Sequence, residues 1–457
     1  MKIKVFFAVL IGKMIRLVCR VLRKGGTASP GRIALKLCPD LLKQLSEGVE
    51  SIIITGTNGK STSVRMVEEG FKEAGVSYFA NLTGANLIEG IATDFIINST
   101  LSGKCRKKYA ILETDELASK EVCRQLQPKV IFVTNLFVDQ VDRFGGVQGT
   151  HDGIGIAIGN ASGAILVLNA DDSVSASLGK NVPNRTIYYG ISEKAAGQCG
   201  YSGSSDVKNC ILCSAELEYS YMTFSHLGAF RCPACGYSHP APDYTVSSVN
   251  AQDLDHSEVT VSAGGKEFPL NINLPAMYNI YNALGSLAAM EAMGISRETA
   301  VASLSKFTCG FGRMESLPQL GKKGAKMVLV KNGAGCDQVL EFLKKYDEEF
   351  ILSIYLNNNV SDGVDITWID TVNFELLNEC RIRSIYVSGM RGEEMTARLL
   401  KAGIDSSRII REPSCPALIS ALKESDCPVF ILPTYTGMMA TRSEIVKQCG
   451  GTEYWER

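Results

Sequence analysis

Histidine is scarce in this sequence, with only His151, His226, His239 and His256 among 457 residues. Hydrolases that attack through a cysteine thiolate need a histidine to activate it. None of the fifteen cysteines lies in the sequence context of a nucleophile elbow. The sequence therefore argues against a Cys–His hydrolytic site within this chain.

An excess of charge of one sign is also missing, because 47 Lys and Arg residues stand against 48 Asp and Glu residues. The formal net charge of −1 gives the whole chain no electrostatic attraction to nucleic acid. We expect no nucleic-acid partner. The 45% hydrophobic content is that of a globular chain, which excludes a mostly disordered protein.

Long hydrophobic runs are absent. The apolar run 5–11 is followed by Lys13, Arg16 and Arg20, so it falls short of the roughly 18 apolar residues that a membrane-spanning helix needs. No small-residue cleavage site follows it. We predict an amphipathic helix with a basic face from about Phe6 to Leu22. A helix docked on the core, a helix on the inner membrane surface and a targeting segment remain open.

Cysteine is plentiful, and its odd number excludes complete pairing within one chain. Two C-x-x-C pairs stand 18 residues apart, a spacing that delivers four thiolates to one tetrahedral zinc ion. Such a site leaves no position for water, so we predict a structural Zn²⁺ in a small insertion. Free thiols are the alternative. The predicted ligands are Cys210, Cys213, Cys232 and Cys235.

A glycine-rich loop, residues 56–62, follows a short β-rich run and opens a helix. Glycine lets backbone N–H groups approach phosphate oxygens, and the helix N-terminus favours their negative charge. Lys60 would reach the outer phosphates, and the Ser61 hydroxyl would ligate Mg²⁺. Only two residues separate Gly56 from Gly59-Lys60, fewer than in the standard loop. The predicted phosphate-binding residues are Gly56, Thr57, Asn58, Gly59, Lys60, Ser61 and Thr62.

Strands and helices alternate along most of the chain, which predicts α/β architecture with parallel sheets. We expect an N-terminal helical segment (1–48), a central phosphate-loop domain (49–312) with the zinc-ribbon insertion at 197–243, and a Rossmann-like α/β C-terminal domain (313–457). Helices are predicted at 35–45, 60–74 and 278–293. Strands are predicted at 51–55, 109–112, 130–134, 164–168, 186–189, 268–274, 326–330, 350–355, 382–388 and 429–432.

The segment TGTNGKST, containing Lys60, resembles the ATP loop of the Mur ligase family, which also includes folylpolyglutamate synthases. Further motifs of that family follow in order: Leu112-Glu113-Thr114-Asp115-Glu116, Thr134-Asn135-Leu136 with Asp139 and Asp142, Leu168-Asn169-Ala170-Asp171-Asp172, Tyr278-Asn279-Ile280-Tyr281-Asn282 and Gly312-Arg313-Met314-Glu315.

The resemblance implies an ATP-dependent ligase that phosphorylates a carboxylate and lets an amine attack the acyl phosphate. It implies that Ser61 and Glu113 bind Mg²⁺, that Asn279 meets the adenine and that Arg313 contacts nucleotide phosphate. Lys60 and Glu113 would then be catalytic. Three of these residues also have a purely structural alternative. Glu113 would be a solvated carboxylate, Asn279 a helix cap and Arg313 a partner in a structural ion pair.

Several stretches resemble the MurT branch of this family, the ATP-binding subunits of lipid II isoglutaminyl synthases. They are 26–42, 81–93, Val330-Lys331-Asn332-Gly333-Ala334-Gly335, Asp362-Gly363-Val364-Asp365-Ile366-Thr367-Trp368-Ile369, 388–391 and 432–436. Gly333 replaces a proline of that pattern, and Asp370 stands where a second tryptophan is expected. Lys331-Asn332 replaces the aspartate that binds ribose elsewhere in the family.

This resemblance implies amidation of the D-glutamate α-carboxylate of lipid II in peptidoglycan synthesis. Ammonia would come from a GatD-type class I glutaminase partner. The acid that orients the partner's histidine would come from this chain, and Asp362 is the choice, with Asp365 in reserve. The structural alternative for Asp362 is that it only forms an Asp-Gly turn. We expect a cytoplasmic location, and peripheral attachment at the inner face of the membrane remains open.

Two other functions compete with this one. A stand-alone Mur-type or folylpolyglutamate-type amino-acid ligase would turn over ATP without a glutaminase. A non-enzymatic nucleotide-dependent binding module would bind ATP without metal-dependent turnover through Glu113. A glutaminase that co-purifies with the chain would disfavour both.

Overall fold

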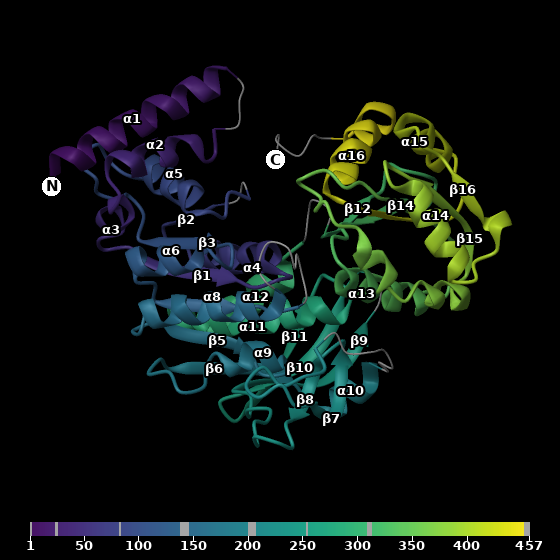
Figure 1. The fold of residues 1–457 in the computed structure, drawn as a ribbon, viewed down its shortest axis with the longest axis horizontal. Coiled ribbons are helices and arrows are strands. Elements are labelled where there is room, and N and C mark those ends of the chain that lie inside the picture. Colours follow the sequence, from purple (N-terminus) through teal and green to yellow (C-terminus); the bar gives the residue numbers. More distant parts are fainter. Residues whose placement is uncertain are drawn as a thin grey trace. The chain divides into compact units, whose positions relative to one another are not determined.

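The computed structural model describes residues 2–22, 26–81, 84–137, 146–199, 207–252, 255–308 and 313–451, without the side chains of Lys2, Cys199 and Arg313. The chain forms two compact units, one of residues 1–273 and 277–307 and one of residues 274–276 and 308–457 (Figure 1). None of the described helices is long and apolar enough to cross a membrane.

The first unit is built on a nine-stranded sheet with the order β11-β10-β9-β6-β5-β4-β1-β3-β2. The strands from β2 to β9 run parallel, and β9, β10 and β11 form an antiparallel edge. The strands are β1 (Glu50–Thr55), β2 (Tyr78–Ala80), β3 (Tyr109–Glu113), β4 (Val130–Val133), β5 (Ile165–Asn169), β6 (Thr186–Ile191), β9 (Tyr244–Gln252), β10 (Ser257–Ala263) and β11 (Lys266–Ile272).

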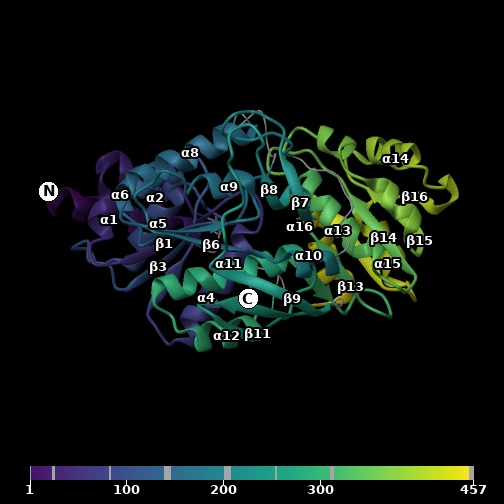
Figure 2. The same ribbon diagram turned by 90° about the horizontal axis from the view of Figure 1, so that it is seen from below.

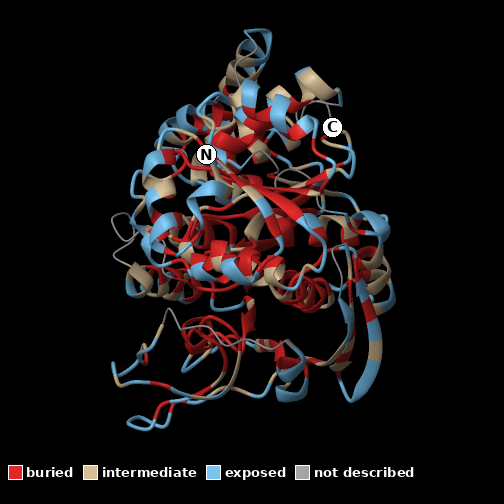
Figure 3. Cartoon of the chain, turned by 90° about the vertical axis from the view of Figure 1, so that its right-hand side faces the viewer, coloured by how far each residue is buried: buried red, intermediate tan, exposed pale blue. Residues whose placement is uncertain are grey.

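Helices cover both faces of this sheet (Figure 2). On one face lie α4 (Lys60–Glu73), α11 (Met277–Met293) and α12 (Arg297–Lys306); the other carries α5 (Ile88–Asn98), α6 (Ser119–Leu126) and α8 (Gly146–Asn160). The central strands are buried along almost their whole length, as expected for parallel strands covered on both sides. Figure 3 colours the chain by burial, with buried residues in the interior and exposed residues on the outer faces of the helices. Further helices are α1 (Lys2–Val21), α2 (Ser29–Leu37), α3 (Leu41–Leu45), α9 (Ser173–Ser177) and α10 (Glu193–Cys199).

The predicted helix at 35–45 is two helices, α2 and α3. Pro39 explains the break, because its ring disfavours helical geometry at the preceding residue, and Cys38 has φ −139° and ψ 88°. The antiparallel edge differs from the prediction, which continues the alternation of strands and helices through the run 268–274. The cysteine-rich insertion contains a hairpin of β7 (Glu218–Phe224) and β8 (Leu227–Arg231).

The second unit contains a six-stranded sheet with the order β12-β13-β17-β14-β15-β16, in which only the β12–β13 pair is antiparallel. Its strands are β12 (Arg313–Leu317), β13 (Ala325–Val328), β14 (Phe350–Tyr355), β15 (Ile382–Ser388), β16 (Ile409–Arg411) and β17 (Val429–Pro433). Its helices are α13 (Gly333–Lys344), α14 (Gly392–Lys401), α15 (Cys415–Lys423), α16 (Tyr435–Cys449), and the short 3₁₀ helices η1 (Thr367–Asp370), η2 (Phe374–Glu379) and η3 (Ser406–Arg408).

Candidate functional site

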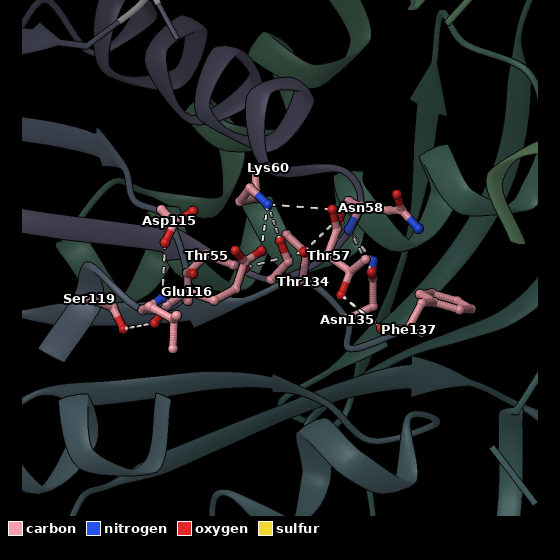
Figure 4. Close-up of polar contacts among 12 residues, drawn as sticks. Thr55, Thr57, Asn58, Lys60, Asp115, Glu116, Ser119, Thr134, Asn135 and Phe137 are labelled. Atoms are coloured by element: carbon pink, nitrogen blue, oxygen red, sulfur yellow. Dashed lines mark hydrogen bonds and ion pairs between the residues drawn. The ribbon is translucent and has the colours of Figure 1, made fainter. Parts of the chain in front are cut away.

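The glycine-rich loop joins β1 to the N-terminus of α4, where the sequence predicted it. The end of β4 holds the loop in place, as Figure 4 shows. The backbone N–H of Thr57 donates to the Asn135 carbonyl at 2.8 Å, and the N–H of Asn58 donates to the Asn135 side-chain oxygen at 2.9 Å. The Thr134 hydroxyl donates to the Asn58 carbonyl at 2.7 Å. The loop is therefore shaped by a neighbouring strand, before any phosphate binds.

Both glycines of the loop are required by backbone geometry. Gly56 has φ +120°, and a Cβ there would lie 2.7 Å from the Asn135 carbonyl oxygen. Gly59 has φ +84°, and a Cβ there would lie 2.2 Å from the side-chain oxygen of Asn282 on α11. L-residues rarely adopt these φ values, and the neighbours leave no room for a side chain.

Lys60 begins α4, and its ammonium group is buried against a carboxylate. The distance from Lys60 Nζ to Glu116 Oε1 is 2.6 Å, and the two side chains are 12% and 8% exposed. Lys60 Nζ also donates to the carbonyl of Gly56. The ammonium is thus held over the loop, where the outer phosphates of a nucleotide are expected. Glu116 is part of the motif at 112–116, but the motif alone predicted no role for it.

Glu113 is the last residue of β3 and is buried. In the parallel register it lies opposite Ile54, two residues before the phosphate loop. The amide of Asn81 fixes its backbone, because it donates to the Glu113 carbonyl and accepts from the Glu113 N–H, both at 2.7 Å. A rigid carboxylate next to the loop suits a Mg²⁺ ligand, and Ser61 stands in the first turn of α4.

Asn279 lies in the first turn of α11 and is buried. Asn282, one turn later, packs against Gly59 of the loop, so the start of α11 lies beside the phosphate loop. The side chain of Arg313, and Asp139 and Asp142, lie outside the described part of the chain. Asn282 could have been found from the sequence only by knowing that α11 passes the loop.

The four predicted zinc ligands come together. The sulfur atoms of Cys210, Cys213, Cys232 and Cys235 lie within 4.8 Å of one another. The Cys210–Cys235 and Cys213–Cys232 sulfur distances are 3.8 and 3.4 Å. A tetrahedral zinc ion with Zn–S bonds of about 2.3 Å requires sulfurs about 3.8 Å apart. The cluster therefore fits a structural Zn²⁺.

The two knuckles of this cluster share a backbone design. After the second cysteine of each pair the chain enters the left-handed region, at Ser214 (φ +63°) and Gly236 (φ +73°). Their N–H groups donate back to the carbonyls of Cys210 and Cys232 at 2.8 and 3.1 Å. Each turn folds its two thiols toward one point.

The cysteine-rich insertion is tied to the nine-stranded sheet through two buried aspartates that follow β5. His239 Nε2 lies 2.7 Å from Asp171 Oδ1, and His226 Nε2 lies 3.2 Å from Asp172 Oδ1. Asp171 also accepts hydrogen bonds from the Tyr281 hydroxyl and the Ile191 N–H. Two of the four histidines thus have a role as anchors of the insertion, which the sequence did not reveal.

One further contact leads from the ribbon hairpin to the phosphate loop. The rings of Phe137 and His226 lie 4.7 Å apart, and those of Phe137 and Phe224 lie 5.8 Å apart. The N–H of Phe137 donates to the Thr57 hydroxyl at 3.0 Å. Phe137 alone therefore links the hairpin to the loop through these contacts.

Asp362 and Asp365 lie in the loop after β14 in the second unit. Asp362 is buried, and its carboxylate accepts from the Thr436 N–H and hydroxyl, both at 2.6 Å, and from the Asn359 N–H at 3.0 Å. Asp365 is exposed, and its bonds to the Thr367 N–H hold the pKa of its carboxyl below the usual value. Asp362 thus fixes the start of α16, and Asp365 faces solvent.

Large apolar side chains are exposed around these two carboxylates. Val360, at 91% exposure, and Val364 flank Asp362 in sequence. Met390 is exposed next to the same loop, since its N–H donates to the Asn357 side chain at 2.9 Å. Exposed Tyr435 precedes Thr436, the partner of Asp362. Such a patch is typical of a surface that another protein covers.

Comparisons with known proteins agree with these observations. The family described as Mur ligase middle domain matches residues 54–230, and the family described as MurT ligase C-terminal matches residues 329–438. The mixed α/β fold with parallel sheets is that of Mur ligases, as the sequence predicted. A MurF from Acinetobacter baumannii superimposes with a TM-score of 0.65, at 13% identity over 91% of this chain and 81% of that chain. A pseudomurein peptide ligase type C from Methanothermus fervidus gives 0.64, at 21% identity over 87% and 79%.

Two curated relatives are similar over nearly their whole length. The lipid II isoglutaminyl synthase (glutamine-hydrolyzing) subunit MurT of Streptococcus pneumoniae is 32% identical over 97% of both chains. The protein of the same name from Staphylococcus aureus strain COL is 30% identical over 94% of this chain and 95% of its own.

Proposed function

The chain belongs to the MurT subunits of lipid II isoglutaminyl synthase, ATP-dependent ligases of the Mur ligase family that act in peptidoglycan synthesis, and on that premise we propose how its residues share the reaction. The first unit would activate the carboxylate with ATP. The second would complete the glutaminase of a partner subunit. The division into segments 1–48, 49–312 and 313–457 remains part of this proposal.

In the activation step, the D-glutamate α-carboxylate of lipid II attacks the γ-phosphorus of ATP, giving an acyl phosphate and ADP. Ammonia then attacks the acyl carbon, inorganic phosphate leaves, and the nitrogen loses a proton to give D-isoglutamine. Both steps build negative charge on phosphate oxygens, which is where a fixed cation contributes most.

Lys60 would supply that cation. It has to exchange Glu116 for phosphate oxygens when ATP binds, and the N–H groups at the start of α4 would hold the phosphates. Ser61 and Glu113 are the groups that would hold Mg²⁺, which neutralises phosphate charge when bound. The roles of Asn279 and Arg313 remain predictions from the resemblance. The observation that carries the proposal is the preformed loop, with Lys60 over it and Glu113 beside it.

The partner would be a GatD-type class I glutaminase. The exposed apolar side chains around Asp362 support a protein partner at this loop. A class I glutaminase also needs a carboxylate to orient its histidine, which this loop would supply. The four-cysteine cluster would serve only to hold the ribbon together. Because the substrate is lipid-linked, the chain would work at the inner face of the membrane.

Reconstitution with the partner tests the proposal. We expect glutamine-dependent conversion of lipid II to its amide, with one ADP released per amide formed. ATP turnover without amide formation, or transfer of an amino acid instead of ammonia, would favour a stand-alone ligase.

The carboxylate assignment needs separate variants. Asp362→Asn should lower glutamine hydrolysis by about 10³-fold, by analogy with triad aspartates, while added ammonium salt restores amidation. Thr436→Ala is the matched control, because it loosens the same loop but keeps the carboxylate. If Asp365→Asn is inactive and Asp362→Asn is not, the role moves to Asp365. Normal hydrolysis in both variants would refute the shared site.

A further inference from the structure

Helix α1 has a buried face and an exposed apolar face. Val5, Ala8, Val9 and Gly12 are buried against the rest of the first unit. Gly12 marks the closest approach, because a Cβ there would lie 2.9 Å from the Ile96 side chain on α5. This face fully accounts for the docking of α1 on the core.

The opposite face is apolar too, yet nothing described covers it. At about 100° per residue, its residues project roughly half a turn away from the buried ones. Ile3 and Val21, near the two ends, are each 73% exposed. The row runs the whole length of the helix, which lies along one edge of the first unit (Figure 1). Its large exposed members are Ile3, Phe7, Met14, Leu17, Val18 and Val21.

Positive charge surrounds this row. Residues 1–39 contain nine Lys and Arg and no Asp or Glu, so they carry +9 in a chain whose net charge is −1, and residues 40–457 carry −10. On α1, Lys4 and Arg20 are exposed. Lys13 donates to the Ile97 carbonyl, and Arg16 donates to the Gly26 carbonyl, so both lie at the flank next to the core.

We propose that the exposed face of α1 lies in the surface of an anionic lipid bilayer. An apolar row between cations is the pattern of helices that rest in the interface plane, with apolar side chains among acyl chains and cations near lipid phosphates. A second copy of α1 fits less well, because the cationic flanks of two paired copies would repel each other and this segment has no acid to offset them. This inference rests on the proposed function, since it deepens how the chain meets a lipid-linked substrate.

Flotation of the purified full-length chain with lipid vesicles tests the proposal. We expect binding to vesicles of 30% phosphatidylglycerol in phosphatidylcholine, and at least tenfold weaker binding to pure phosphatidylcholine. The triple variant Phe7→Gln, Met14→Gln and Leu17→Gln should bind the anionic vesicles at least tenfold more weakly, because glutamine keeps the helix but removes the apolar row.

Two further variants keep the test decisive. Lys4→Gln with Arg20→Gln should weaken binding and reduce its dependence on salt. Ile156→Gln with Leu400→Gln removes exposed apolar side chains elsewhere and should bind like wild type. Equal binding by wild type and the triple variant would overturn the proposal. The proposal would also fail if the wild-type chain did not bind vesicles. It would fail too if an α1 variant instead lost the ability to form a dimer or to bind the partner subunit.

Two forms of the substrate separate this inference from the proposed function. With lipid II in detergent micelles, the triple variant should amidate within a few-fold of wild type. With lipid II in vesicles, it should lose at least tenfold. Equal amidation rates of the triple variant and wild type on both forms would refute only the membrane role of α1. No amidation by wild type on either form would refute the proposed function.

Discussion

Replacing Lys60 separates the structural and the chemical roles of its ion pair with Glu116. The two side chains are 12% and 8% exposed, and 2.6 Å separates Nζ from Oε1. Lys60→Met leaves the Glu116 carboxylate buried without its cation. Breaking such a pair typically costs about 3 kcal/mol or more of unfolding free energy. It also removes the proposed cation over the phosphate loop, which should lower amidation by about 10³-fold.

The double variant Lys60→Met with Glu116→Gln tests the reasoning. Because an uncharged amide replaces the stranded carboxylate, we expect it to recover most of the lost stability but none of the activity. Urea unfolding followed by circular dichroism gives the stability, and tryptophan fluorescence marks the unfolding of the second unit separately, because both tryptophans, Trp368 and Trp455, belong to it. ATP-dependent amidation, with glutamine hydrolysis by the partner as the control, gives the activity.

Two results would refute this account. Amidation near the wild-type rate in Lys60→Met would remove the phosphate-loop assignment. A double variant no more stable than the single variant would show that the ion pair does not bear on stability as its burial implies.

Three other predictions follow from single features of the first unit. Gly56→Ala should cost about 3 kcal/mol of stability and at least 10²-fold in amidation, because its Cβ meets the Asn135 carbonyl. Its control Gly75→Ala (φ +64°, nothing within 4 Å) should cost about 1 kcal/mol and no activity, so equal effects would contradict the argument. Metal analysis should find one zinc per chain. Cys232→Ser should lose this zinc and unfold more easily, and it should raise the KM for ATP more than it lowers kcat. A zinc-free wild type with four freely titrating thiols would be inconsistent with the cluster. Burial raises the pKa of Asp94 to about 7, against the opposing effect of Arg16. The folded state therefore binds more protons than the unfolded state between about pH 4 and 7, and stability falls as pH rises through that window. Asp94→Asn should remove this slope and raise stability at pH 8 by up to about 4 kcal/mol, and unchanged melting curves from pH 5 to 8 would show that Asp94 titrates normally.

Features that depend on neighbours along the chain could be predicted from the amino-acid sequence. The strand, loop and helix around Lys60 occupy consecutive residues, and so do the two cysteine knuckles, so spacing alone predicted their local form. The amphipathic character of α1 was also visible as a pattern. Pro39 divides the helix predicted at 35–45, and this effect is local too, because a proline disfavours helical geometry at the residue before it.

Tertiary structure alone decided which groups meet. Glu116 reaches Lys60 because β3 and β1 are adjacent in the sheet, and the order of strands cannot be read from local pattern. His226 contacts Asp172, 54 residues away in the sequence, and His239 contacts Asp171, 68 residues away, because the insertion folds back over the end of β5. The same holds for the two faces of α1. Apolar residues occur all around that helix, and only its packing on the core determined which of them are buried and which remain exposed.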